Sequence, residues 1–177
     1  MYNAHAQVVF YEDFDGVPGP TAGGPGTYSF PTGWTLANVD NRTPDAAVSY
    51  VNNAWTRRED FNFNVADSAA FSTSYYSPTG ASDDWMITPA IGPLPANTVL
   101  SWNAVAYDPA FMDGYEVRIM TVAPTGGTGT IGKLVSASTV LYSTTAENSA
   151  WTARAVNLSA YAGQTVYISF RNNSSDK

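Results

Sequence analysis

Short runs in which apolar and polar residues alternate recur along the chain, separated by turns rich in Gly, Pro, Asn and Asp. In residues 115–120, Tyr115, Val117 and Ile119 alternate with Glu116, Arg118 and Met120. This two-residue period predicts antiparallel strands with one buried face and one face in water. No segment shows three turns of the spacing that an amphipathic helix requires.

About ten runs of this kind predict strands. They are residues 8–11, 33–39, 47–55, 69–77, 84–88, 98–107, 114–122, 133–143, 151–159 and 165–172. Strands of this length, at this spacing and without intervening helices, predict two packed sheets, an all-β antiparallel jelly-roll sandwich. We expect residues 7–177 to form a single domain.

The composition narrows the class of protein. Of 177 residues, 44% are hydrophobic and only 13% are charged, a pattern typical of extracellular β proteins. The net charge of −7 excludes a basic surface for nucleic acid and disfavours anionic membranes. The chain has no cysteine, which removes disulfides, zinc–thiolate sites and thiol catalysis. No run approaches the roughly 20 apolar residues of a membrane span, so we expect no membrane insertion.

The first residues resemble the end of a secretory signal peptide. Ala4, His5 and Ala6 form the small-residue pattern that precedes a cleavage site. We interpret residues 1–6 as the remnant of such a signal, which indicates secretion; a flexible N-terminus is the alternative.

Signals for catalysis are weak. The segment Gly127–Leu134 matches most of a phosphate-binding loop, but it lacks the Ser or Thr that binds magnesium, and its surroundings favour strands. The one histidine, His5, lies in the expected signal remnant, which argues against a Ser-His-Asp triad. We therefore expect no enzyme activity and no catalytic residues.

Acidic residues gather where predicted strands begin or end. Three clusters are present: Glu12, Asp13 and Asp15; Asp40, Asn41 and Asp45; Asp83 and Asp84. A sandwich can bring such loops together, and Ca²⁺ prefers six to eight oxygen ligands of this kind. Acids in solvated loops explain the same spacing equally well.

Aromatic residues lie near several expected loops. The candidates for ligand contact are Tyr75, Tyr76, Tyr107 and Phe111, with Tyr115 close by. Such rings can stack on sugars or bury in a protein partner. They can also fill the ends of a sandwich core, which is the commoner role.

Several segments, in this order, resemble one family. They are "YEDFDG", "PTGWTLANVDN", "SDDWMITPAI", "LSWNAVAYDPAFMDGYEVRIMT" and "VYISFRNNSSDK". Together they resemble the cleaved-adhesin, or choice-of-anchor J, domains of bacterial surface proteins, which include the haemagglutinin-adhesin modules of gingipains. The resemblance extends over most of residues 8–177.

The resemblance implies a jelly-roll sandwich with structural calcium and a role in adhesion. Carried over residue by residue, the calcium candidates are Asp15, Asp40, Asp83 and Asp84, with Glu12 and Asp113 as weaker ones. In the family, a last strand with an acidic pair follows the segment that ends here at Lys177. Either another segment supplies that strand, or its absence leaves an open sheet edge, which a partner could extend by strand addition.

These observations predict a secreted, calcium-stabilised adhesion or binding module at a bacterial surface. Loops 16–26, 75–83 and 107–114 would meet the ligand. Expected partners are a protein or glycan of the host or a neighbouring cell, or other copies of the chain. The alternatives are a structural subunit of a surface assembly and an accessory carbohydrate-binding module of a larger hydrolase or protease.

Overall fold

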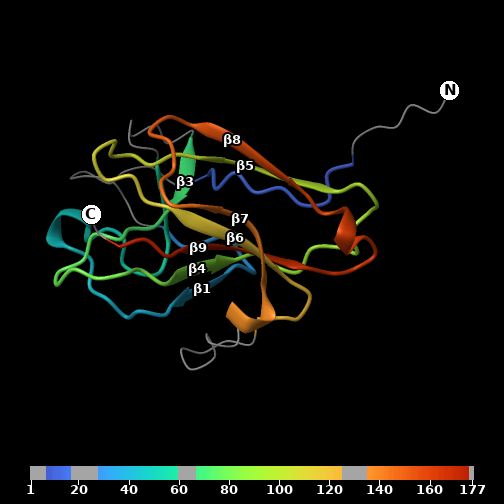
Figure 1. Ribbon diagram of the computed structural model, residues 1–177, viewed down its shortest axis with the longest axis horizontal. Coiled ribbons are helices and arrows are strands. Elements are labelled where there is room, and N and C mark those ends of the chain that lie inside the picture. Colours follow the sequence, from blue (N-terminus) through green and yellow to red (C-terminus); the bar gives the residue numbers. More distant parts are fainter. Residues whose placement is uncertain (1–6, 17–27, 60–66, 125–134, 176–177) are drawn as a thin grey trace.

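A computed structural model describes residues 7–16, 28–59, 67–124 and 135–175 (Figure 1). Several sequence-based interpretations lie outside these ranges: the signal remnant with His5, most of the loop 16–26, the segment Gly127–Leu134 and the open edge after Lys177. The described residues are almost entirely strands and loops, and every strand pairing among them is antiparallel.

Nine strands are present in the described part of the chain. They are β1 (Thr35–Asn38), β2 (Thr56–Glu59), β3 (Ser68–Phe71), β4 (Asp84–Ile87), β5 (Val99–Ala104), β6 (Tyr115–Met120), β7 (Thr139–Thr144), β8 (Thr152–Asn157) and β9 (Tyr167–Asn172). They form a five-stranded sheet in the order β1-β4-β9-β6-β7 and two pairs, β2-β3 and β5-β8. Two short 3-10 helices, η1 (Ala46–Val48) and η2 (Ser159–Tyr161), lie in the loops between strands.

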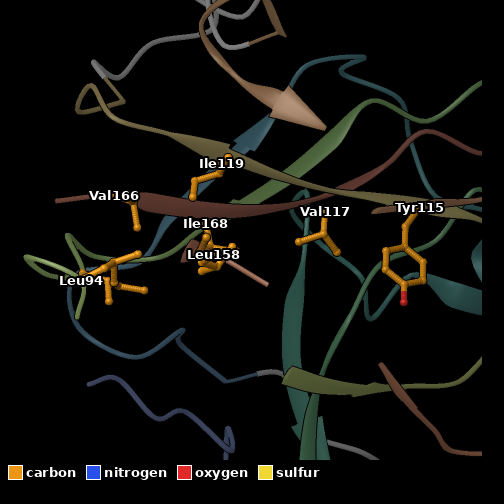
Figure 2. Packing of buried hydrophobic residues seen from close by; sticks show 8 residues of the cluster. Leu94, Tyr115, Val117, Ile119, Leu158, Val166 and Ile168 are labelled. Atoms are coloured by element: carbon orange, nitrogen blue, oxygen red, sulfur yellow. The ribbon is translucent and has the colours of Figure 1, made fainter. Parts of the chain in front are cut away.

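The main core lies between the five-stranded sheet and the β5-β8 pair. Tyr115, Val117 and Ile119 project from one face of β6 toward Leu158, as Figure 2 shows. Trp102 of β5 packs against this cluster from the opposite layer. The alternation expected in both strands is thus confirmed on this side, and the all-β sandwich is confirmed as the fold class.

The second face of the five-stranded sheet differs from expectation, because it is covered as well. Trp85, Ile87 and Met120 form a second buried cluster, with Val135 and Tyr167 packed against it. Apolar residues of β4 thus face both ways, and "DWMI" is buried throughout.

Charged side chains on this covered face pair with one another. Arg171 bonds to Asp83 at 2.6 Å and to Glu116 at 3.2 Å, and Glu116 also pairs with Arg118 at 2.7 Å. The guanidinium groups of Arg118 and Arg171 both lie over the ring of Trp85. Paired in this way, charges can lie on a buried face.

Four of the expected strands differ most from the prediction. Residues 8–11 form no strand, and 47–55 contain η1 because the side chain of Asp45 accepts the Ala47 N–H and initiates a turn. Within 69–77 only β3 is regular, and 133–143 contributes a strand only from Thr139. Conversely, β2 is a strand that the pattern did not indicate, since "TRRE" carries three charges.

Candidate functional site

One end of the five-stranded sheet carries a row of polar residues. Asn38 ends β1, Asp84 begins β4 and Asn172 ends β9; register pairs Asp84 with both asparagines. Asn172 also pairs with Tyr115, the first residue of β6. The row therefore crosses four neighbouring strands where their loops begin.

Asp84 is the most buried acid of this row, with 2% of its surface exposed. Its Oδ2 accepts a hydrogen bond from the Tyr76 hydroxyl at 2.7 Å and lies 3.2 Å from the Ser82 hydroxyl. Its Oδ1 is buried and has no hydrogen-bond partner. A buried carboxylate oxygen without a donor is costly, so this atom calls for a proton or a cation.

Asp40 and Asp83 lie beside Asp84. The Asp83 N–H donates to Oδ2 of Asp40 at 2.6 Å, and the Arg42 N–H donates to the other oxygen of Asp40 at 2.7 Å. Asp83 Oδ1 accepts from Arg171 and from the indole of Trp85. The structure thus brings three of the four main calcium candidates to one place.

The ionisation of Asp84 reflects this setting. Its pKa is raised to about 7, mainly by burial and also by the charges of Asp40 and Asp83, although hydrogen bonds from Tyr76 and Ser82 act to lower it. Burial also raises the pKa of the Tyr76 hydroxyl, which therefore stays neutral and donates to Asp84.

The acids of the first segment lie elsewhere. The N–H of Ser68, at the start of β3, donates to Asp15 Oδ1 at 2.8 Å, and Glu12 accepts the Phe14 N–H at 2.9 Å. Arg57 donates to the carbonyls of both Phe14 and Asp15. The guanidinium of Arg57 thus fixes this segment to β2, a role that the sequence did not indicate.

Asp113 lies at the same end as Asp84 but joins different loops. Its side chain accepts the Ser74 hydroxyl at 2.7 Å, and its carbonyl accepts the Glu147 N–H at 2.8 Å. Asp15, Asp40 and Asp83 were expected to lie together, but only Asp40 and Asp83 do. Asp15 lies beside β2 and β3 instead, because the first segment of the chain runs there.

The acids differ in how well they suit the calcium that the resemblance implies. In the ranges that the structure describes, no three acids lie close enough to hold a metal ion together. Asp15 does not suit it, because Arg57 already contacts its carbonyl and would repel a divalent cation. Asp84 suits it, because its buried Oδ1 lacks a donor and Asp40 and Asp83 add negative charge nearby.

Loops from both layers are joined at this end of the sandwich, on the left in Figure 1. Loop 72–83 meets loop 105–114 through Ser74 and Asp113. Loop 105–114 meets loop 145–151, where the Ala106 N–H donates to the Asn148 carbonyl at 2.8 Å.

Glu147 stabilises the same end from within. It is buried and accepts hydrogen bonds from Tyr115 of β6 and Arg154 of β8, so it links the two layers. Burial raises its pKa, but the bonds from Arg154, the Asn148 N–H and Tyr115 outweigh burial and hold the pKa below its usual value.

The joined loops expose four large aromatic side chains. The exposed fractions are 44% for Tyr75, 63% for Tyr107, 56% for Phe111 and 55% for Trp151, and we call these four residues the aromatic rim. Tyr76, the fourth ring expected to meet a ligand, is instead buried against Asp84. Trp151 was missed because it opens a predicted strand, although it directly follows the polar turn "ENS".

Solved structures with the same arrangement of strands are known. The K2 cleaved adhesin domain of Lys-gingipain matches with a TM-score of 0.55 at 18% identity, covering 85% of this chain and 90% of that domain. The K1 and K3 cleaved adhesin domains of Lys-gingipain from Porphyromonas gingivalis W83 match with TM-scores of 0.55 and 0.54, each at 17% identity. They cover 88% and 85% of this chain, and 91% and 89% of their own lengths.

A sequence relative agrees with the structural matches. Hemagglutinin A of Porphyromonas gingivalis is 27% identical over 161 residues, which cover 82% of this chain. The chain is similar in both sequence and fold to the adhesin modules of gingipains. The resemblance that the sequence motifs indicated is thereby confirmed.

The chain covers 7% of the length of Hemagglutinin A. No family model matches the chain. At 17–18% identity the solved structures establish its fold. Among the described residues, no helix has the length and apolar character that a membrane crossing needs.

Proposed function

We propose that this chain is a non-catalytic adhesion module of a secreted or surface-exposed bacterial protein, and that it binds its partner through the loops around the aromatic rim. The observation that carries the proposal is the likeness to domains described as adhesins, in both fold and sequence. The named relatives are adhesin domains cleaved from a protease and a hemagglutinin, and both descriptions refer to attachment.

The joined loops support this function physically. A surface that binds another molecule loses less entropy when it is already ordered, and hydrogen bonds join loops 72–83, 105–114 and 145–151 to one another. The same loops expose four large aromatic side chains. Because these side chains are not buried in the core, they leave apolar surface that a partner can contact.

Attachment to red cells tests the proposal, because the sequence relative is a hemagglutinin. Latex beads coated with the folded chain provide the multivalency that a single domain lacks. We expect these beads to bind red cells or bacterial cells above beads coated with heat-unfolded chain. Equal binding of the two kinds of bead, on every cell type tried, would contradict the function.

Structural calcium belongs to this proposal as a second part. Asp84 would bind the ion through Oδ1, and Asp40 and Asp83 would contribute negative charge nearby. Bound calcium would neutralise the acids at the start of β4 and so stabilise the loops at this end of the sheet. The support is the buried oxygen without a donor among three acids.

A further inference from the structure

The aromatic rim differs from an ordinary apolar patch in the residues that surround its rings. Tyr107 is followed by Asp108, whose side chain caps the turn that leads to Phe111. Trp151 lies beyond Asn148, an exposed amide that bonds to Thr152. Carboxylate, amide and hydroxyl groups therefore lie near Tyr107 and Trp151 in the chain.

No described arginine side chain is classed as exposed, and each contacts a partner within the chain. The partners are the Ala81 carbonyl for Arg42, the Phe14 carbonyl for Arg57, the Tyr50 ring for Arg58, Glu116 for Arg118, Glu147 for Arg154 and Asp83 for Arg171. The chain also carries a net charge of −7. An anionic ligand such as a sialylated or sulfated glycan would meet repulsion without a compensating donor.

We infer that the aromatic rim is a binding site for a neutral glycan, with Trp151 and Tyr107 as its main stacking residues. The C–H faces of a pyranose ring carry partial positive charge and pack against the negative face of an aromatic ring. Its hydroxyl groups donate to acceptors such as Asp108 and Asn148. This inference rests on the proposed function, since it names the partner class of the same surface.

A basic protein is the other partner that an acidic surface would attract. It fits the rim less well, because a stable protein interface requires a contiguous, well-packed apolar centre. Here the four rings come from three loops, with polar residues between them in the sequence. Separate rings with hydrogen-bonding groups between them suit a chain of sugar units better.

The test is a glycan array that carries neutral, sialylated and sulfated glycans, probed with the intact chain, followed by titration calorimetry with the best neutral ligand. We expect Trp151→Ala and Tyr107→Ala each to weaken binding about tenfold, the loss of one good aromatic contact. Trp151→Phe, which keeps an aromatic ring, should retain most of the affinity that Trp151→Ala loses. Tyr11→Ala is the matched control, because Tyr11 is a more exposed tyrosine outside the three loops.

Binding confined to sialylated or sulfated glycans would overturn the inference, as would neutral binding that Trp151→Ala and Tyr107→Ala leave unchanged. Binding of lysozyme, used as a basic protein probe, that these variants abolish while no glycan binds would also overturn it. The bead assay separates this inference from the function. Beads that bind cells without any glycan on the array refute the glycan and leave adhesion standing; beads that do not bind refute adhesion itself.

Discussion

Removing the carboxylate of Glu147 should loosen the end of the sandwich that carries the aromatic rim. Glu147 accepts from the Tyr115 hydroxyl at 2.9 Å in one layer and from Arg154 at 2.5 Å in the other. Glu147→Ala therefore leaves a buried tyrosine hydroxyl without its acceptor and an arginine without its counter-charge.

The size of the effect follows from burial. Removing one member of a buried ion pair typically costs about 3–5 kcal/mol. The side chain of Arg154 is 25% exposed and can regain water, so we expect a smaller loss than this, about 2–4 kcal/mol of unfolding free energy. For a domain of this length that corresponds to a fall in Tm of about 5–15 °C.

Urea unfolding followed by tryptophan fluorescence measures this change, and a double-mutant cycle with Tyr115→Phe isolates the link. We expect a coupling of about 1 kcal/mol between Glu147 and Tyr115, and none between Glu147 and Tyr167→Phe, because Tyr167 lies at the other end of β9.

The pH dependence has a definite sign. The pKa of folded Glu147 is depressed, so its stabilisation is fully present above the unfolded value of 4.5 and is lost as pH falls through the lower, folded pKa. Wild type should lose stability over that interval, whereas Glu147→Ala should lose less. A fall in unfolding free energy under 0.5 kcal/mol, or equal coupling to Tyr115 and Tyr167, would refute a buried link between the layers.

Three further predictions concern other parts of the chain. Calcium should raise the Tm of wild type above that in chelator, and Asp84→Asn should remove this response; calorimetry that finds the same Tm in both for wild type would eliminate calcium. Arg57→Gln should increase hydrogen exchange at residues 14–16, both with chelator and with calcium, because Arg57 donates to two carbonyls there. If adding chelator to wild type is enough to increase this exchange, a metal ion holds the segment instead. Gly114→Ala should destabilise the domain by about 1–3 kcal/mol in thermal melts, because a Cβ there would meet the Thr144 carbonyl; an unchanged melt would show that the loop moves aside.

The positions of most strands could be predicted from the sequence. β1, β4, β5, β6, β8 and β9 lie within their predicted runs, and in strands such as β5 and β6 the buried face sets the register. The burial of the second face of the five-stranded sheet could not be predicted, since it depends on ion pairs of Arg171 and Arg118 that join strands far apart in the chain.

The candidate site was predictable to the extent that it is local. The motif "SDDW" indicated the cluster at Asp83 and Asp84, and Asp40 joined it as expected. Tyr76 and Trp151 were misjudged because an aromatic residue beside a loop carries no local signal of whether it points into the core or into water. Arg57 gave no signal because its partners are backbone carbonyls of the distant first segment.

Replacing the whole aromatic rim tests the central claim most directly. A variant with Tyr75, Tyr107, Phe111 and Trp151 all changed to Ser, matched for Tm with a variant in which the exposed residues Tyr11 and Val122 are changed to Ser, would be compared on cell-binding beads. Our account expects the rim variant to lose attachment and the matched variant to keep it. Full attachment by the folded rim variant would contradict the claim that this end of the sandwich is the adhesive surface.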